Sequence, residues 1–372
     1  MYAYFGNGLE GESDNLPVSD LANAPASAVV TRLATEPDRA LWDEFVGPQC
    51  RGILMQSWGW GELRRRYGWS VLRLIAQVPE SGAWAGAIQI LHRRVGPFGI
   101  GWAYAPRGPA LSSLGEVGAA AALLARAARD LRRRRVFTLR VDPEWPAGDA
   151  AADHLRRELH LHPADFDIQH RNSWEVDLDA DPLRVSAGLP PSTRRNIRIA
   201  ERQGVSVERQ HTAAAAVEFY QLHLETVERQ NFRTRPLEYY QLARQNLRAE
   251  VFIARQEGVA LAAAMVVAFG PRLIYLYGGT SANRPEARAS YALHWAAIEW
   301  GIGEGCQVYD MWGVPRDFDP QDPSHGYATF KTRWGGRLVS NSGLLLAPMI
   351  PLADALAHRV ERRLLRRRPL LT

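Results

Sequence analysis

Lys331 is the only lysine in this 372-residue chain, in which 44 of the 45 Lys and Arg residues are arginine. A bias toward Arg would replace ordinary surface lysines, so a retained Lys marks a position where a guanidinium group does not serve. Lys carries a compact ammonium group that can meet a single oxygen in a narrow site, whereas Arg carries a broad planar fork. Lys331 is therefore the first candidate for chemistry, although the count alone leaves chance survival of one lysine equally open.

An arginine-rich segment, residues 190–198, is a candidate for binding an anion. Ser192 or Thr193 is expected to cap a helix whose first turn contains Arg194 and Arg195. Cations at a helix N-terminus oppose the helix dipole, so they favour a role in phosphate binding over a role in stability. The ordinary alternative is a basic helix face in water.

A second candidate for anion binding contains Arg229 and Arg233. Their spacing of four residues places both on one helical face or at the end of the helix. Two adjacent guanidinium groups repel each other unless an anion such as a diphosphate lies between them. Pairing with Glu225 or Glu228 is the alternative that needs no ligand.

Two further arginines adjoin capping or turn residues. Ser57 is expected to cap a helix that carries Arg64. Arg107 lies in a Pro-Arg-Gly-Pro turn at the end of a predicted strand, a place where functional sites often lie.

The elements that must position these residues form a duplicated plan. Each copy has three strands joined by short turns, then a long helix and another strand. The copies are offset by about 178 residues, as Leu74 and Phe252 show. In the first copy the predicted elements are 70–77, 84–92, 97–104, helix 115–134 and strand 136–141. In the second they are 250–255, 261–269, 273–278, helix 286–304 and strand 308–312.

This plan predicts an α/β (α+β) protein with two domains, each built on a mixed, mainly antiparallel sheet. We expect a disordered tail over 1–26, a first domain over 27–178 closed by a strand at 171–178, and a second domain over 179–344. A C-terminal helix over about 345–372 is expected to complete the first domain. No heptad pattern of coiled-coil length is present.

Composition excludes several classes of protein. Two cysteines give no disulfide framework and no cysteine-rich zinc site, so we expect no metal and no cofactor. The N-terminus lacks the pattern of a secretory signal, and no apolar stretch is long enough to span a membrane, which indicates a cytoplasmic protein. The net charge of +5 favours an anionic partner. The basic amphipathic C-terminal helix suits either an anionic membrane surface or packing on the protein with its arginines in water.

Five motifs occur in the order that is found in the FemABX family, and the chain resembles that family over residues 30–345. They are Gln-Ser-Trp at Gln56, Pro-Arg-Gly-Pro at Pro106, Arg-Arg-Asn-Ile-Arg at Arg194, Thr-x-x-Arg-x-x-Phe at Thr226 and Phe-Lys-x-x-Trp-Gly-Gly at Phe330. The resemblance implies two GNAT-like domains. It is closest to FemX-like members, because nothing between Arg235 and Glu250 is long enough for a coiled-coil arm.

The resemblance also implies roles for individual residues. Lys331, with Phe330, would support the reaction at the aminoacyl-tRNA end of a channel. Arg64 and Arg229 would hold the diphosphate of the acceptor, and Tyr277 would line the channel. Two positions depart from the family pattern. Arg233 stands where relatives carry Tyr, and Ser112, after the turn that contains Arg107, stands where relatives carry Asp.

The function implied by the resemblance is transfer of an amino acid from aminoacyl-tRNA to an amine on the stem peptide of a peptidoglycan precursor, by a monomer. Two alternatives remain at this point. One is a GNAT-type transferase that uses acyl-CoA, although the segment that would hold the CoA pyrophosphate reads Arg-Pro-Glu-Ala-Arg-Ala from Arg284 and lacks glycine. The other is a relative without catalytic activity that only binds a precursor or tRNA.

Overall fold

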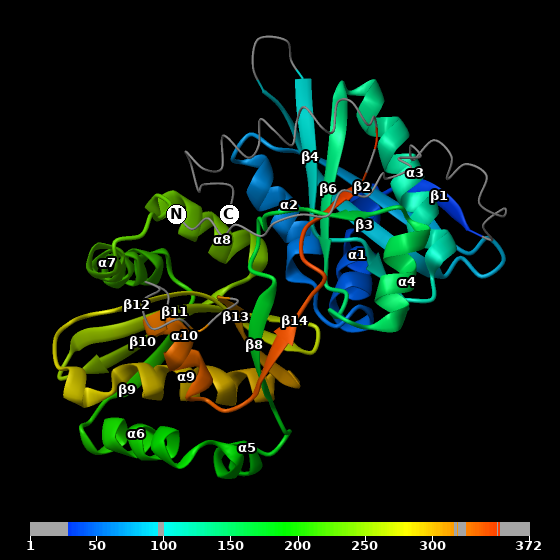
Figure 1. Ribbon diagram of the computed structural model, residues 1–372. Coiled ribbons are helices and arrows are strands. Elements are labelled where there is room, and N and C mark those ends of the chain that lie inside the picture. Colours follow the sequence, from blue (N-terminus) through cyan, green and yellow to red (C-terminus); the bar gives the residue numbers. More distant parts are fainter. Residues whose placement is uncertain (1–28, 96–99, 316–317, 319–324, 348, 350–372) are drawn as a thin grey trace, which may run out of the picture. The chain divides into compact units, whose positions relative to one another are not determined.

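The computed structural model describes residues 29–95, 100–315, 318, 325–347 and 349 (Figure 1). The chain divides into two compact units. The first takes in the described residues of Met1–Arg39, Gly68–Gln169 and Asn341–Thr372, and the second consists of Ala40–Tyr67 and the described residues of His170–Ser340.

The first unit is built on an eight-stranded sheet with the order β1-β2-β3-β4-β6-β15-β7, and β5 pairs with β3. Its only parallel pair is β4 with β6, and the others are antiparallel. The strands and helices of this unit are β1 (Val30–Leu33), β2 (Ser70–Gln77), β3 (Trp84–Val95), β4 (Ile100–Arg107), β5 (Ala110–Leu111), α3 (Val117–Arg133), β6 (Val136–Pro143), α4 (Ala150–Glu158), β7 (His162–Pro163) and β15 (Leu345–Ala347).

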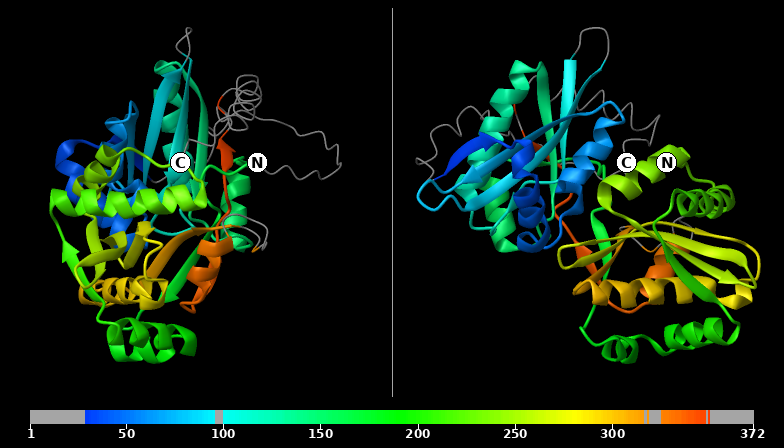
Figure 2. Two further views of the ribbon diagram at one scale, coloured as in Figure 1. Left: turned by 90° about the vertical axis from the view of Figure 1, so that its left-hand side faces the viewer. Right: turned by 180° about the vertical axis from the view of Figure 1, so that it is seen from behind.

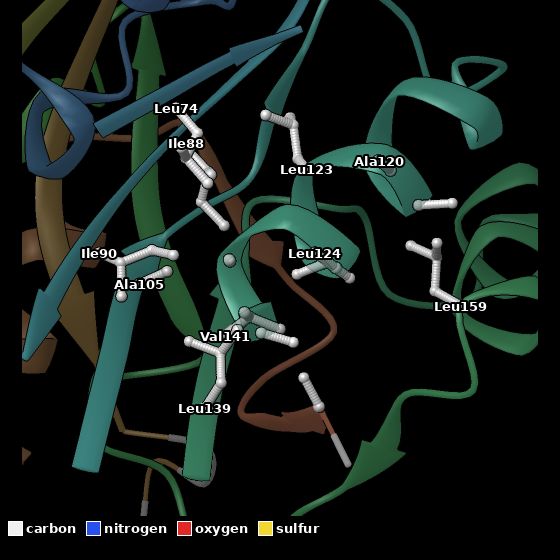
Figure 3. Packing of buried hydrophobic residues seen from close by; sticks show 14 of the residues in the cluster. Leu74, Ile88, Ile90, Ala105, Ala120, Leu123, Leu124, Leu139, Val141 and Leu159 are labelled. Carbon is white, nitrogen blue, oxygen red and sulfur yellow. The ribbon is translucent and has the colours of Figure 1, made fainter. Parts of the chain in front are cut away.

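Helix α3 covers one face of this sheet because its apolar residues recur every three or four positions. Ala120, Leu123 and Leu124 point toward the sheet residues Leu74 and Ile88 (Figure 3), and all five side chains are buried. The core of the first unit therefore lies between α3 and the sheet.

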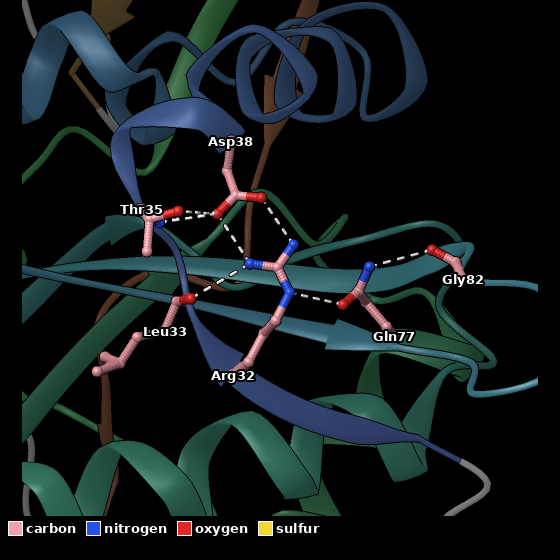
Figure 4. Close-up of polar contacts among 6 residues, drawn as sticks. All are labelled: Arg32, Leu33, Thr35, Asp38, Gln77 and Gly82. Carbon is pink, nitrogen blue, oxygen red and sulfur yellow. Dashed lines mark hydrogen bonds and ion pairs between the residues drawn. The ribbon is translucent and has the colours of Figure 1, made fainter.

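The edge strand β1 is fixed to the rest of the first unit by Arg32 (Figure 4). Its guanidinium donates two hydrogen bonds to the Asp38 carboxylate, of 2.7 and 2.8 Å, and a third to Gln77 on β2, of 2.7 Å. The hydrogen bonds from Arg32 hold the pKa of Asp38 well below its usual range. The bidentate pair thus joins β1 to the turn that follows it, and the hydrogen bond to Gln77 joins β1 to β2.

The second unit is built on a seven-stranded sheet with the order β14-β8-β13-β12-β11-β10-β9, in which only β12 and β13 pair in parallel. Its strands and helices are α1 (Arg39–Glu44), α2 (Trp58–Arg65), β8 (Asn172–Asp177), α5 (Pro182–Gly188), α6 (Pro191–Arg202), β9 (Ser206–Gln210), α7 (Ala213–Gln230), α8 (Leu237–Leu247), β10 (Glu250–Gln256), β11 (Val259–Phe269), β12 (Arg272–Thr280), α9 (Ala289–Gly303), β13 (Val308–Val314), α10 (His325–Thr332) and β14 (Arg337–Ser340).

Two buried clusters cover the two faces of the second sheet. Helices α7 and α8 pack on one face, and α9 packs on the other, with α6 on the outer side of α9 (Figures 1 and 2). Strand β11 supplies both clusters: Ala262 and Ala264 face α9, whereas Ala263 and Met265 face α7 and α8. This alternation is the period of two that a strand buried on both faces requires.

The predicted duplication is confirmed. The order β2-β3-β4-α3-β6 in the first unit repeats as β10-β11-β12-α9-β13 in the second. The predicted α/β class with mixed, mainly antiparallel sheets is likewise confirmed. The segment 236–249, which the sequence predicts to be too short for a coiled-coil arm, holds the single helix α8.

The predicted boundaries differ from the compact units in two segments. The strand expected to close the first domain, observed as β8, pairs with β13 and β14 of the second sheet. Residues 40–67 also belong to the second unit, where α2 packs against α8. Residues 345–347 join the first unit, as predicted, but they form strand β15 between β6 and β7 where a helix was expected. Strand pairing over long sequence separations sets these memberships, and local patterns do not encode it. The predicted 1–26 tail and most of the predicted C-terminal helix lie outside the described residues.

One predicted helix starts later than expected. Arg288 has a left-handed backbone conformation, with φ of 53°, so the segment from 285 forms a short 3-10 turn before α9 begins at Ala289.

Candidate functional site

The central feature of the second unit is the separation of its parallel strands. Strands β12 and β13 pair only from Arg272 to Ile274 and from Val308 to Asp310, although β12 continues to Thr280 and β13 to Val314. On its other edge β13 pairs with β8 from Val308 to Val314, through a bulge between Asp310 and Gly313. In the first unit, by contrast, β4 and β6 stay paired to Arg107 and Pro143. The second unit is thus the one whose sheet separates at the ends of its parallel strands.

Lys331 lies beside the separated end of β13. It sits in the last turn of α10, is only 7% exposed, and its Nζ donates a 2.7 Å hydrogen bond to the backbone oxygen of Gly313. The ring centroid of Tyr327, one turn earlier in α10, is 5.0 Å from Nζ. A single carbonyl and one ring face thus surround the ammonium group, an environment suited to a compact cation.

Burial lowers the pKa of Lys331 to about 7, and the nearby Asp310 carboxylate opposes that shift. The buried His294 of α9 has a pKa lowered to about 3 by burial and by Lys331. His294 is therefore neutral at physiological pH, and its Nδ1 is 2.6 Å from the Tyr309 hydroxyl. Lys331 is the group in this cluster that changes charge near neutral pH.

The bulge in β13 sets the direction of the Gly313 carbonyl. Trp312 has φ of 67°, a left-handed conformation that is rare for a bulky residue. The Asp310 carboxylate accepts a 2.8 Å hydrogen bond from the Trp312 backbone N–H, and it lies 3.6 Å from the Arg272 guanidinium. A Cβ at Gly313 would approach His170 to 2.5 Å, so only glycine fits there.

Phe330 packs within an aromatic group behind Lys331. Its ring centroid lies 5.4 Å from that of Tyr291, 5.1 Å from that of His294 and 6.3 Å from that of Trp334. Phe330 therefore supports α10 against α9, and Lys331 faces β13 from the next position.

Arg229 lies on the other face of the sheet, at the C-terminal end of α7. It is exposed, and it donates hydrogen bonds to the Thr280 backbone oxygen, 3.0 Å, and to the Thr280 hydroxyl, 2.6 Å. No ion pair joins it to Glu225 or Glu228 in the described part of the chain. Thr280 ends β12, so Arg229 is held at the end of the strand that separates from β13.

Arg64 and Tyr277 lie in the same group of residues as Arg229. Arg64 is buried on α2, and its charge acts on the Tyr277 hydroxyl. Tyr277 is three residues before Thr280 on β12, and its hydroxyl is 3.0 Å from that of Tyr239. The sequence identified Arg64, Arg229 and Tyr277 separately. In the fold, Tyr277 and the Thr280 partner of Arg229 lie on the same strand, β12, and Arg64 is close enough to Tyr277 for its charge to be felt there.

Tyrosine and histidine residues of α7 and α8 complete this group. The Tyr240 ring centroid is 5.0 Å from that of Tyr277, and the Tyr240 hydroxyl is 3.0 Å from His223 Nε2. His223 Nδ1 is 2.8 Å from the Gly278 backbone oxygen, and burial lowers the pKa of His223. A neutral histidine therefore ties α7 to β12.

Two predicted site residues, Arg233 and Arg107, lie in surroundings that differ from those of Arg229. Helix α7 ends at Gln230 and Asn231 follows in a left-handed conformation, so the exposed Arg233 does not share a helical face with Arg229. Arg107 belongs to the first unit. Its backbone N–H donates a 2.6 Å hydrogen bond to Asp142, and its side chain lies 4.0 Å from the Glu144 carboxylate.

The two predicted helix caps have different outcomes. The Ser57 hydroxyl accepts a 3.1 Å hydrogen bond from the Trp60 backbone N–H and caps α2 as predicted. The predicted cap of the basic helix is wrong, because α6 begins at Pro191 with Pro190 as its N-cap. The Thr193 hydroxyl instead donates to the Arg333 backbone oxygen.

Several residues of these two groups were missed in the sequence. Asp310 and Gly313 stand in the short run Asp-Met-Trp-Gly of a predicted strand, and Tyr239 and Tyr240 form an adjacent pair in a helix. A charge inside an apolar strand was the available signal for Asp310.

Within the described residues, no group of three or more His, Cys, Asp or Glu side chains could hold a metal ion. No described helix has the length and apolar character that crossing a membrane would require.

Comparison with known proteins gives matches over most of the chain. The FemAB family model matches residues 153–254 and 241–362. The chain is 27% identical over 286 residues to the UDP-N-acetylmuramoylpentapeptide-lysine N(6)-alanyltransferase of Weissella viridescens. This alignment covers 73% of this chain and 83% of that relative. It is 21% identical over 402 residues to the lipid II:glycine glycyltransferase of Staphylococcus aureus, in an alignment that covers 86% of this chain and 94% of that relative.

Solved structures share the fold. The FemX crystal structure matches with a TM-score of 0.80 at 18% identity, covering 88% of this chain and 100% of FemX. A tandem GNAT protein from the clavulanic acid biosynthesis pathway matches with a TM-score of 0.51 at 15% identity, covering 87% of this chain and 99% of that protein. These matches confirm the predicted fold of two GNAT-like units.

Proposed function

We propose that this chain, which belongs to the FemAB family, is an aminoacyltransferase that adds an amino acid to the stem peptide of a peptidoglycan precursor. The donor in this proposal is an aminoacyl-tRNA, and the acceptor is an amine of the precursor. The names of two relatives, an alanyltransferase acting on a muramoylpentapeptide lysine and a lipid II:glycine glycyltransferase, support this assignment.

The observation that carries the proposal is the separation of β12 and β13, with a different group of residues on each side of it. Lys331 adjoins β13 on the α9 face, whereas Arg229, Arg64 and Tyr277 adjoin the end of β12 on the α7 face. Lys331 and the Arg229 group thus lie on the two faces of the sheet at the strands that separate, and we propose that each face receives one substrate. This arrangement suits a transfer between two large molecules.

The reaction is acyl transfer from an ester to an amine. The amine nitrogen attacks the ester carbonyl, a C–N bond forms, and the C–O bond to the terminal ribose of the tRNA breaks. The ester is already activated, so the enzyme must chiefly align a neutral amine with it and stabilise the developing oxyanion.

Lys331 is proposed to serve this oxyanion or the adjacent terminal phosphate. The protonated Nζ is fixed by the Gly313 carbonyl, and its remaining N–H groups can donate to a substrate oxygen. Phe330 fixes the helix that carries Lys331 through its aromatic contacts. The low dielectric around a buried ammonium strengthens its interaction with an anion.

Arg229 and Arg64 are proposed to bind the diphosphate of the precursor. Both are forked cations suited to phosphate oxygens, and Arg229 is oriented by Thr280 while it remains exposed. Tyr277 is proposed to line the path between the diphosphate and the reacting amine. Arg233 and Arg107 are proposed as further substrate-binding residues; Arg233 is exposed after the end of α7, and Arg107 lies in the first unit with its side chain 4.0 Å from the Glu144 carboxylate.

Acyl-CoA is the competing donor, and the start of α9 argues against it. A pyrophosphate would need free backbone N–H groups at this helix N-terminus. Here the N–H groups of Ala287 and Arg288 are used in the 3-10 turn, at 3.0 Å to Arg284 and 3.4 Å to Pro285. An aminoacyl-tRNA donor places the reaction in the cytoplasm, and we propose that the protein acts there as a monomer.

The test is a product analysis with defined donors and acceptors. The purified chain is incubated with aminoacylated total tRNA and either UDP-MurNAc-pentapeptide or lipid II, and the product mass is measured. We expect one acceptor to gain the mass of an amino acid, with loss of the product when the tRNA is deacylated first.

Three controls separate the alternatives. Product formed with acetyl-CoA in place of tRNA would identify an acyl-CoA transferase. Precursor binding without any mass gain, under conditions where a related transferase is active, would identify a relative without catalytic activity. Lys331→Ala should bind the precursor as wild type does and give no product.

A further inference from the structure

Helix α6 presents a row of arginines for which the proposed chemistry has no use. Arg195, Arg198 and Arg202 are exposed, and spacings of three and four residues place them on one face of the helix. The opposite face is buried against α9 through Ile197 and Ala200. We call these three exposed residues the α6 arginine row.

The charges of this row are not used by the protein itself. None of the three arginines forms an ion pair with any residue whose position the structure gives. Their one hydrogen bond within the row runs from Arg202 Nε to the Arg198 backbone oxygen, 3.3 Å. Some other exposed arginines of this unit do form ion pairs, such as Arg184 with Asp179 and Arg337 with Asp177. Stacking like charges along one helix face costs stability unless an anion compensates them.

The row begins next to the segment that carries Lys331. The Thr193 hydroxyl, in the first turn of α6, donates a hydrogen bond to the Arg333 backbone oxygen, and Arg333 is exposed. Lys331 precedes Arg333 by two residues and lies in the last turn of α10. Arg333 therefore lies beside the first turn of α6, in the same unit as the proposed reaction centre.

We propose that the α6 arginine row, together with Arg333, is the docking surface for the phosphate backbone of an RNA duplex whose 3′ end reaches Lys331. This inference rests on the proposed function, which supplies an RNA-linked donor. The row runs from Arg195 to Arg202, seven residue steps or about 10 Å along the helix axis. Duplex DNA presents one negative charge per about 1.7 Å of its axis, so a duplex of similar charge density offers several phosphates over that length.

The chemistry of α6 favours RNA over an anionic membrane. A helix that lies on a membrane needs an exposed apolar face beside its basic face. The apolar face of α6 is buried, and none of its large apolar residues is exposed. Double-stranded RNA is bound largely through phosphate and 2′-hydroxyl contacts, for which rigidly spaced arginines are suited.

The experiment compares two variants that lose the same charge. In the first, Arg195→Gln and Arg198→Gln remove two members of the row and keep helix-forming side chains. In the control, Arg129→Gln and Arg133→Gln remove two exposed arginines of α3 in the first unit. The probe is an unacylated RNA hairpin with a seven-base-pair stem and a single-stranded ACCA end, titrated at several salt concentrations.

We expect the row variant to bind the hairpin about tenfold more weakly and to lower the slope of log affinity against log salt by about two, one for each arginine removed. The control should stay close to wild type in both. In turnover, the row variant should raise KM for the aminoacyl-tRNA about tenfold while kcat and the precursor KM remain unchanged.

Equal losses in both variants, or an unchanged salt slope in the row variant, would overturn the docking surface. So would loss of binding to vesicles of phosphatidylglycerol with unchanged hairpin binding, which would assign the row to a membrane. A failure of the proposed function is distinguishable, because wild-type protein would then form no product with any aminoacyl-tRNA.

Discussion

Lys331 combines burial, a single carbonyl partner and a charge that changes near neutral pH. Burial lowers its pKa to about 7, so in the folded protein the ammonium is replaced by the amine as pH rises through that value. If the ammonium stabilises the oxyanion, kcat should fall as pH rises through about 7. An activity profile that stays flat from pH 6 to 9 would remove Lys331 from that role.

Lys331→Arg should abolish most turnover although it keeps the positive charge. The pocket offers one oxygen, Gly313 O at 2.7 Å, and one ring face, and a planar fork with five donors cannot be satisfied there. We expect kcat to fall by about 100-fold or more, as for loss of an oxyanion donor. Near-normal kcat with a verified aminoacyl-tRNA would contradict this.

Lys331→Met tests the cost of burying the ammonium. Because the folded-state pKa is below the unfolded value, the unfolded chain binds more protons between pH 7 and 10.5, and the stability of the wild type rises with pH in that window. The Met variant should therefore gain the most free energy of unfolding over the wild type below pH 7. This gain should decline by about 1.4 kcal/mol per pH unit between pH 7 and 10.5. Denaturant melts at pH 6, 8 and 9.5 measure this difference.

Arg229→Ala should raise the KM for the precursor and leave kcat largely unchanged. Charge-assisted hydrogen bonds to a phosphate contribute about 1.5 to 3 kcal/mol, so an increase of roughly tenfold or more is expected. Thr280→Val is the matched variant, because it removes the hydroxyl that orients Arg229 and should give a smaller rise in KM. If KM is unchanged in Arg229→Ala, the diphosphate is bound elsewhere.

At the scale of elements, the bulge in β13 decides where the Gly313 carbonyl points. Asp310 holds this bulge through the Trp312 N–H, and its charge raises the pKa of Lys331 against the effect of burial. Trp312 accepts a left-handed conformation that costs of order 1 to 3 kcal/mol, so the surrounding contacts must fix it. The bulge is thus a strained feature at the proposed reaction centre.

Asp310→Asn separates the two roles of Asp310. The amide oxygen can still accept from the Trp312 N–H, whereas the negative charge near Lys331 is lost. We expect the fold to be retained and the fall of kcat with pH to move to lower pH, because Lys331 then loses its ammonium more easily. A pH profile identical to wild type would show that Asp310 acts only on the backbone.

At the scale of the molecule, each unit completes its own core from distant parts of the chain. Leu345 of β15 is fully buried in the first unit and pairs with Val141 of β6 and with Pro163 of β7. Two hundred residues of sequence separate β6 from β15, so this core closes only when the C-terminal segment returns. The second unit has its own buried residues, such as Leu273.

Leu345→Ala should destabilise the first unit by about 2 to 5 kcal/mol, the usual cost of a buried Leu to Ala change. In hydrogen exchange, peptides from β6 should exchange faster while peptides from β11 and β12 remain protected. Leu273→Ala should show the reverse pattern. Equal acceleration in both units by either variant would mean that the two cores unfold together.

Much of the fold follows from local patterns. Strands β2, β3, β10 and β11, and helix α3, could be predicted because runs of apolar residues bounded by turn residues indicate elements directly. Strand pairings with a distant partner could not be predicted. Strand β8 joins the second sheet between β13 and β14, and the C-terminal segment, expected to complete the first domain as a helix, does so as strand β15 between β6 and β7.

The sequence by itself determined the duplicated α/β plan, the family resemblance and the identity of Lys331, Arg229, Arg64 and Tyr277 as candidates. Residue type and spacing carry that information. Only the tertiary structure decided that the strands of the second unit separate, that Arg233 lies off the helix of Arg229, and that a bulge turns one carbonyl toward Lys331. These depend on which strands hydrogen-bond and which do not, a property of contacts between distant residues that local pattern cannot fix.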